Sequence, residues 1–311
     1  MTADNVNDFP YEPAERALDP ATRRAYWDVA MGLQDVDGLH PSAYLRQLAD
    51  EHVAGVRSLD ETGAMLRAYY AERDAAGEDP GARRGVPAAG DGGEREADFV
   101  SQRIAEVLAR QAFALIPATL KQIHAHLFGA LDAQAYRPGV YKDVPLLKSE
   151  LILNGDSVSY ADPSLVESSL DFAFSEERGH LYTLSFEDAE LDHFARFISR
   201  VWQVHPFCQG NTRTVAVFAI LYLNDLGFDV DNRPFAEHAT YFRNALVRAN
   251  YRNAKAGVLP DRAPLNRFFD NVVNGATHEL RSRDLMMQAL FDNPNLLRNM
   301  SPSRAIVNRV N

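Results

Sequence analysis

The segment HPFCQGNTRT, residues 205–214, combines a histidine with residue types that bind phosphate. Gly210 has no Cβ and suits a tight turn, and Asn211 is typical of a helix N-cap. The first amides of the helix that follows, with the positive end of its dipole, form a site for anions. Arg213 lies in the first turn of that helix, where its planar group can bind a phosphate through two parallel hydrogen bonds.

His205 comes a few residues before this predicted anion site, and the ordinary pKa of histidine is close to neutrality. A neutral imidazole can take a proton from a hydroxyl group that attacks phosphorus. A base beside a phosphate site predicts phosphoryl or nucleotidyl transfer, in which positioning and charge neutralisation supply most of the rate. The spacing alone is equally compatible with a structural histidine and an arginine that caps a helix.

Two helices must position this segment. An amphipathic pattern runs from Leu191 to Trp202, and an almost wholly apolar one runs from Thr214 to Leu226. The first helix must end near His205, because the residue before a proline is disfavoured in the helical region. The second is expected to be buried on every side. Further helices are predicted around Val100–Leu108, Leu120–Phe128, Phe235–Asn250 and Pro264–Asn274.

The stretch Leu147–Tyr160, LKSELILNGDSVSY, differs from the rest because apolar and polar residues partly alternate around Asn154-Gly155. An Asn-Gly pair between two short strand-like runs is the strongest local signal of a β-hairpin. The predicted fold class is therefore all-α, a helical bundle with one small β-hairpin.

Residues 77–97 are rich in glycine and proline with few apolar side chains, which predicts a flexible linker. The linker separates an N-terminal module, residues 1–76, from a body, residues 98–290, and residues 291–311 form a C-terminal tail. The module reads as three short helices, with starts at Asp19-Pro20, after Pro41 and at Ser58, and with the first helix ending near Gly38. Such helices bury little area alone, so we expect them to pack on the body.

Composition narrows the function. The 311 residues carry a formal net charge of -11, which argues against non-specific binding to nucleic acid or to an anionic membrane. The longest apolar run, Val215 to Leu223, is far shorter than the ~20 residues that span a bilayer. The N-terminus has no secretory signal pattern, and the single cysteine, Cys208, excludes an intramolecular disulfide and a cysteine-rich zinc site. We expect a cytoplasmic protein without nucleic-acid or membrane partners.

The segment HPFCQGNTRT resembles the signature of the Fic family, His-Pro-Phe-x-(Asp/Glu)-Gly-Asn-x-Arg. The stretches LKQIHAHLFGAL before the predicted hairpin and YFRNALVRANYRN after the signature lie where Fic domains have similar segments. The similarity extends over roughly residues 98–290. It implies a helical core and, most often, the transfer of AMP from ATP to a hydroxyl side chain of a target protein.

The resemblance assigns roles to residues of this sequence. His205 would be the general base, and the nucleotide phosphates would be bound by Gly210, Asn211, Thr212 and Arg213. The hairpin would be a flap that docks the target's backbone by strand addition. The residues expected in this flap are Lys148, Leu151, Ile152, Leu153, Asn154 and Gly155.

Three positions depart from the family pattern. Gln209 stands where the family usually has an acid that holds Mg²⁺, so the metal would be held weakly by a neutral oxygen. Thr212 replaces a common glycine and adds bulk near the phosphates. Ala216 stands where many members have a second arginine that contacts the γ-phosphate of ATP.

The N-terminal module is similar to the small antitoxin proteins that accompany one class of Fic enzymes. Those proteins carry an inhibitory motif, (Ser/Thr)-x-x-x-Glu-(Gly/Asn), whose glutamate pairs with the second arginine. Here the motif is degenerate, with Leu33, Asp37 and Gly38 at its three defined positions. Because Ala216 replaces the second arginine, Asp37 is expected to lack an arginine partner and to inhibit weakly. Equally, Asp37-Gly38 can be read as a simple helix end.

The leading hypothesis is a toxin–antitoxin-like protein adenylyltransferase, attenuated by Gln209, with ATP as substrate and Mg²⁺ as a weakly held cofactor. Its expected partners are a target protein on the flap and the chain's own N-terminal module, while the oligomeric state stays open. Two alternatives are retained. The same fold can transfer another phosphate-bearing group, or it can serve as a non-enzymatic module that binds a nucleotide or a protein.

Overall fold

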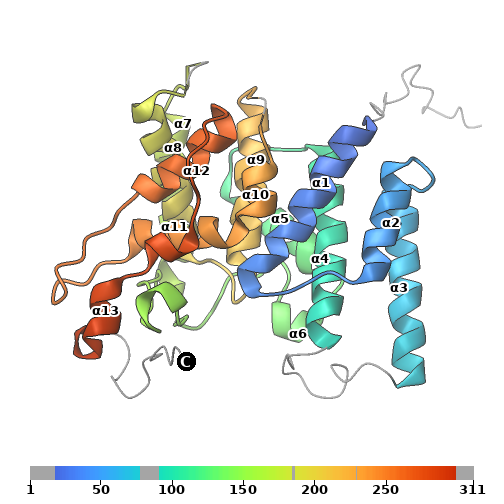
Figure 1. The fold of residues 1–311 in the computed structure, drawn as a ribbon, viewed down its shortest axis with the longest axis horizontal. Coiled ribbons are helices and arrows are strands. Elements are labelled where there is room, and N and C mark those ends of the chain that lie inside the picture. Colours follow the sequence, from blue (N-terminus) through green and yellow to red (C-terminus); the bar gives the residue numbers. More distant parts are fainter. Residues whose placement is uncertain (1–17, 78–90, 184–185, 229, 299–311) are drawn as a thin grey trace, which may run out of the picture.

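The computed structural model describes residues 18–77, 91–183, 186–228 and 230–298 (Figure 1). Over these ranges the fold is mostly helical and contains no β-strand, only one isolated bridge between Asn253 and Val258. No helix in these ranges is long and apolar enough to cross a membrane.

The longer helices are α1 (Pro20–Gly32), α2 (Ala43–Val53), α3 (Leu59–Ala76), α4 (Asp91–Arg110), α5 (Pro117–Phe128), α7 (Val166–Arg178), α8 (Asp188–Val204), α9 (Asn211–Asp225), α11 (Ala239–Asn250) and α12 (Ala263–Val273). The short helical segments are η1 (Leu33–Asp37), α6 (Ala133–Tyr136), η3 (Leu151–Leu153), η4 (Pro163–Leu165), α10 (Arg233–Glu237), η5 (Ser282–Leu285), α13 (Gln288–Asp292) and η6 (Pro294–Leu296).

The helix starts predicted near the N-terminus are confirmed. The carboxylate of Asp19 accepts from the amides of Ala21 and Thr22 at 2.8 and 3.0 Å and caps α1. Ser58 and Glu61 form the predicted capping box of α3. After α1 the chain tightens into η1, which ends at Gly38 with a φ of 68°, a value that suits glycine. The local sequence therefore specifies these boundaries.

The N-terminal helices pack directly on the body. Helix α1 lies between α4 and α10, and a Cβ on Gly32 would stand 2.0 Å from the carbonyl oxygen of Ala236. The fully buried Asp98 of α4 joins α2 and α3 to the body. Its carboxylate accepts from the amide of Ser42 at 2.7 Å, from the Ser42 hydroxyl at 2.6 Å and from the Tyr70 hydroxyl at 2.8 Å.

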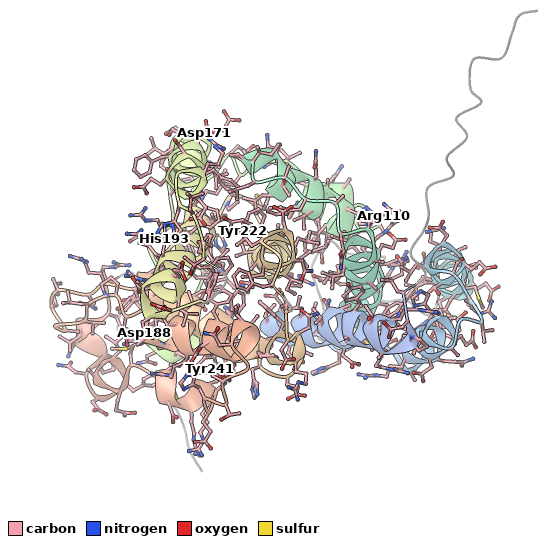
Figure 2. All side chains as sticks on the ribbon, turned by 90° about the horizontal axis from the view of Figure 1, so that it is seen from above. Arg110, Asp171, Asp188, His193, Tyr222 and Tyr241 are labelled. Carbon is pink, nitrogen blue, oxygen red and sulfur yellow. The ribbon has the colours of Figure 1, made fainter. Side chains whose placement is uncertain are left out.

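Helix α9 is the centre of the molecule, as the view from above shows (Figure 2). Every residue from Asn211 to Leu223 is buried, as the apolar pattern predicts. Helix α8 packs beside it with one apolar face and ends at Val204, as expected from the proline at position 206. The turn that carries the His205–Thr214 segment is thus held between two helices anchored in the core.

The predicted β-hairpin is wrong. Instead of two strands, Leu151–Leu153 forms the 3₁₀ turn η3, and Asn154 and Gly155 follow with φ of 52° and 85°. The consecutive residues Ile152 and Leu153 are both buried, so the segment turns into the core and does not alternate between core and solvent. The C-terminal part of the chain supplies hydrogen-bond partners for polar groups of this segment. The Met287 amide donates to the Ile152 carbonyl, and the Asn154 side chain donates to the Leu290 carbonyl.

The structure also bears on the two predicted connecting regions. Helix α4 begins at Asp91, inside the stretch predicted as a linker, and residues 78–90 lie outside the described ranges. Of the predicted C-terminal tail, residues up to 298 are described and pack on the body. Leu297 is buried, and the Arg298 amide donates to Asp156 at 2.9 Å. Residues 299–311 lie outside the described ranges.

We expect the change Asp98→Ala to lower the free energy of unfolding by about 3 kcal/mol, because it leaves buried donors of Ser42 and Tyr70 without an acceptor. Denaturant unfolding monitored by circular dichroism measures the effect. The control is Asp74→Ala, which removes a surface pair with Arg95 between the same helices α3 and α4 and should cost at most about 1 kcal/mol. Equal losses in both variants would contradict the role of Asp98 as an anchor.

Candidate active site

The turn between α8 and α9 has the tight geometry that its sequence predicts. His205 ends α8 with a φ of 50°, a strained value for a residue with a side chain. Gly210 has a φ of 69°, and a Cβ there would stand 2.2 Å from the Phe128 ring. Gly210 is therefore required both by its backbone conformation and by the close approach of α5.

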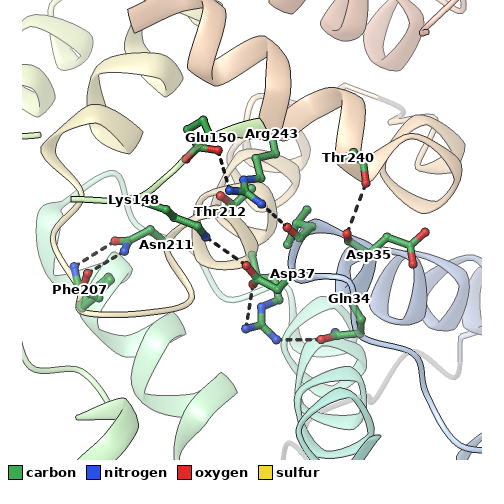
Figure 3. Close-up of polar contacts among 12 residues, drawn as sticks. Gln34, Asp35, Asp37, Lys148, Glu150, Phe207, Asn211, Thr212, Thr240 and Arg243 are labelled. Atoms are coloured by element: carbon green, nitrogen blue, oxygen red, sulfur yellow. Dashed lines mark hydrogen bonds and ion pairs between the residues drawn. The ribbon is translucent and has the colours of Figure 1, made fainter. Parts of the chain in front are cut away.

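Asn211 does not cap α9 as the sequence suggested, because Gly210 occupies the N-cap position and Asn211 is the first helical residue. Its side chain points back instead, accepting from the Phe207 amide at 3.0 Å and donating to the Phe207 carbonyl at 2.7 Å (Figure 3). Both ends of this amide are thus used to lock the turn. Since the first amides of a helix have no carbonyl one turn earlier, the amides at the start of α9 are available to an anion.

Two further side chains brace the turn from outside. His124 of α5 accepts from the Gly139 amide through Nδ1 at 2.9 Å, so its Nε2 carries the proton and donates to the Gln209 carbonyl at 3.2 Å. Burial lowers the pKa of His124 to about 4, consistent with this neutral form. Lys142 holds both neighbours of His205, because its amide donates to the Pro206 carbonyl at 2.8 Å and its ammonium to the Val204 carbonyl at 3.1 Å.

The His205 imidazole is buried among aromatic rings and is 6% exposed. Tyr160 stacks on it with ring centroids 3.9 Å apart, and Trp202 meets it edge-on at 5.8 Å. Burial, followed by the charges of Lys148 and Lys142, lowers the pKa of His205 well below its usual 6.5. The imidazole is therefore neutral at pH 7, the form that can accept a proton.

Arg213 points away from solvent, and its two terminal nitrogens are paired by residues from distant parts of the chain, whereas its buried Nε has no hydrogen-bond partner among the described residues. Its guanidinium donates to Gln34 of η1 at 2.9 Å and lies 3.1 Å from the Asp37 carboxylate (Figure 3). It also donates to Glu96 of α4 at 2.6 Å. The same group lies 5.0 Å from the centre of the Phe128 ring. The prediction that Asp37 has no arginine partner is wrong, because Asp37 pairs with Arg213 of the signature in place of the missing second arginine.

Asp37 also pairs with Lys148, whose ammonium lies 3.2 Å from its other oxygen. Partial burial raises the pKa of Asp37, but the nearby Arg213, Lys148 and Arg243 outweigh burial and lower it below the usual value. Asp37 is therefore ionised at neutral pH. The cations that would face a phosphate here are already neutralised by carboxylates.

A cavity of about 360 Å³ adjoins these groups. It brings together most of the residues that the sequence analysis selected, from the base to the phosphate site. They are His205, Gln209, Gly210, Asn211, Thr212, Arg213, Asp37 and Lys148. A larger cavity of about 640 Å³ lies between α1 and α10 and contains none of the signature residues, so size alone does not select the site.

The donors around this cavity do not fit a tightly held Mg²⁺. Gln209 offers only a neutral side-chain oxygen, and the two carboxylates at the cavity, Asp37 and Glu96, are both bound to Arg213. The described residues contain no cluster of three or more histidine, cysteine or acidic side chains able to hold a metal. We therefore derive no catalytic step through a protein-bound metal.

The residues predicted for the flap are divided between the site and the core. Lys148 lines the cavity, and Leu151 is 72% exposed on the surface. In contrast, Ile152, Leu153, Asn154 and Gly155 are buried, and this segment makes hydrogen bonds to the C-terminal part of the chain. Next to Lys148, the buried Glu150 binds Arg243, which also donates to the Val36 carbonyl at 2.7 Å (Figure 3).

The degenerate inhibitory motif is likewise divided. Leu33 is fully buried in the core, Asp37 reaches the cavity, and Gly38 provides the left-handed turn that ends η1. The sequence analysis missed Gln34 and Glu96, the other partners of Arg213. Gln34 falls at an undefined position of the degenerate inhibitory motif, and the predicted linker boundary places Glu96 outside the body.

We expect the His205 imidazole to titrate well below pH 6.5, because burial and the nearby ammonium groups disfavour its charged form. Replacing Lys148 by Met removes one of these positive charges and should raise the pKa of His205. A pH titration followed by NMR of ring-labelled histidine measures both values, with Lys255→Met, at an exposed position, as the control. A wild-type pKa at or above 6.5 would contradict this account of the site.

Comparison with known proteins agrees with the geometry. Residues 114–223 match the model of the Fic/DOC family, and this range includes α5, α8, the signature turn and most of α9. No curated protein and no solved structure matches the chain. The Fic/DOC family is known for AMP transfer and related transfer reactions. The similarity to the Fic/DOC family is thus shown for a domain at residues 114–223, which contains the signature turn.

Proposed function

We propose that this protein transfers AMP from ATP to a hydroxyl side chain of a target protein, and that the structure corresponds to its resting state. The observation that carries the proposal is the cavity in which a neutral buried imidazole, His205, and the first turn of α9 meet. Its volume of about 360 Å³ is within the range of small-molecule sites, ~300–1,000 Å³. Fic/DOC domains generally carry out nucleotidyl or phosphoryl transfer, which supports this choice of reaction.

In the proposed reaction, His205 removes the proton of the target's hydroxyl as its oxygen attacks the α-phosphorus of ATP. The bond from that phosphorus to the bridging oxygen breaks, and pyrophosphate leaves with the electron pair. The amides at the start of α9 and the guanidinium of Arg213 stabilise the negative charge on the phosphates. The depressed pKa of His205 keeps the base neutral, although it also makes the imidazole a weaker base.

The resting state follows from the occupied guanidinium. Arg213 is bound by Asp37 and Glu96, so a phosphate must displace at least one carboxylate before it can bind there. Both carboxylates line the cavity, but Asp37 belongs to the N-terminal segment and is 27% exposed at its side chain, whereas Glu96 is 10% exposed. We therefore propose that the N-terminal module restrains the activity through Asp37.

Incubation of the protein with labelled ATP and a lysate tests the transfer. We expect the wild type to label a protein and the variant His205→Ala to lose the label, because it has no base. The mass added to the labelled protein separates AMP from another phosphate-bearing group. Equal labelling by both proteins, or the absence of label even with the acid restored in Gln209→Glu, would overturn the proposal in favour of a binding module.

We expect Asp37→Ala to increase the affinity for ATP about tenfold, because it removes one of the two carboxylates that compete for Arg213. Calorimetric titration with ATP measures the change. The matched control is Asp35→Ala, which removes a carboxylate from the same segment, η1, that is not paired with Arg213 and lies 3.6 Å from His40. If the two variants bind ATP equally, Asp37 does not restrain the site.

A further inference from the structure

Thr212, the residue that replaces a common glycine of the signature, makes a hydrogen bond into the core. The indole nitrogen of Trp202 donates to its hydroxyl oxygen at 3.0 Å. Both side chains are buried, with exposures of 1% for Trp202 and 7% for Thr212. An indole nitrogen can only donate, so the threonine hydroxyl must act as the acceptor and its own proton remains for another partner.

Trp202 is in turn part of the aromatic enclosure of His205. Its ring meets the imidazole at 88° and the Tyr160 ring at 76°, with both centroid distances 5.8 Å. Tyr160 covers the face of the imidazole at 3.9 Å. The Nδ1 atom of His205 is buried and has no hydrogen-bond partner among the residues that the structure describes. The orientation of the imidazole is therefore set by these packed rings and not by a hydrogen bond at Nδ1.

We propose that Thr212 is a positioning residue for His205 and acts through Trp202. The Trp202–Thr212 bond spans the signature turn from the last turn of α8 to the first turn of α9, so it fixes the indole relative to the phosphate-binding end of α9. The indole then holds the imidazole at a defined distance from that end. A glycine at this position has no side-chain atom that could make the bond.

This role differs from that of Lys142, which holds the backbone on both sides of His205 through the Val204 and Pro206 carbonyls. The Lys142 bonds fix the position of the His205 backbone, and the Trp202–Thr212 bond fixes the orientation of the His205 ring. General base catalysis needs both, because proton transfer requires a heavy-atom separation of about 2.6–3.2 Å in a suitable direction. The inference about catalysis rests on the proposed function, while the ring positioning itself does not.

Two substitutions separate the hydroxyl from the volume of the side chain. Thr212→Val keeps the shape but removes the acceptor, and Thr212→Ser keeps the acceptor. Thr214→Val is the matched control, because Thr214 is also fully buried in the first turn of α9 but its hydroxyl has no hydrogen-bond partner within the described ranges. The NMR resonances of the His205 ring, with the Trp202 indole proton, report the geometry without any need for activity.

We expect Thr212→Val to shift the His205 ring resonances and the Trp202 indole proton, while Thr212→Ser and Thr214→Val leave them near their wild-type positions. In the labelling assay Thr212→Val should lower the rate about tenfold, with rescue by Thr212→Ser. If Thr212→Val does not fold, Thr212→Gly takes its place.

Unchanged His205 resonances in the variant without the acceptor, or equal shifts in Thr214→Val, would overturn the inference. Shifted resonances in Thr212→Val together with an unchanged labelling rate would also overturn its catalytic part. A wild-type protein that transfers nothing would contradict the proposed function, whereas the NMR comparison would still decide whether Thr212 positions the ring.

Discussion

A guanidinium that is 2% exposed at the centre of the molecule organises this structure. A charge cannot be buried without partners, because the desolvation of an unpaired ion costs several kcal/mol. Arg213 obtains its partners from η1, which supplies Gln34 and Asp37, and from α4, which supplies Glu96. The N-terminal segment therefore contributes side chains to the candidate site. It packs on the body through this pairing as well as through the apolar contacts of α1.

In the proposed function, the same pairing makes the binding of a nucleotide an exchange of anions at Arg213. A phosphate that binds Arg213 gains a favourable interaction with the guanidinium. It must also displace a carboxylate, which then interacts with water or with another cation. For Asp37 that other cation is present, since Lys148 lies 3.2 Å away and can keep the carboxylate paired. Glu96 also accepts a hydrogen bond from the Tyr136 hydroxyl. The carboxylate of Glu96 therefore keeps one partner when Arg213 binds a phosphate. The net affinity is then a difference between two ionic networks of similar charge, and small changes in either network shift the balance.

Much of the architecture was predictable because local signals determine it. The capping groups at Asp19 and Ser58, the stop before Pro206 and the uniformly apolar pattern of α9 each act over a few residues. The hairpin failed for the opposite reason. Asn154-Gly155 indeed forms a tight turn, but the burial of Ile152 and Leu153 against the C-terminal part of the chain is a tertiary effect that the alternation of residue types does not reveal.

The candidate site shows the same division. The signature predicts His205, Gly210 and Arg213 as site residues, because they are close in sequence and each residue type has a well-defined chemical role. The partners of Arg213 come from more than a hundred positions away, and no pattern in the chain connects Glu96 or Gln34 to position 213. The prediction that Asp37 lacks an arginine partner considers only position 216. Arg213 lies one turn earlier on the same helix and pairs with Asp37.

The two halves of the site differ in how firmly they are fixed. The turn is held by many short-range bonds, from Asn211 to Phe207, from His124 to Gln209 and from Lys142 to the carbonyls around His205. These bonds support a strained backbone at His205, so the geometry of this proposed base is preorganised and needs no rearrangement in the proposed reaction. The charges on Arg213 and Lys148, in contrast, are balanced by carboxylates that an anion can replace. In the proposed function, regulation therefore acts on which anion occupies the guanidinium, because the turn around His205 is fixed by these bonds.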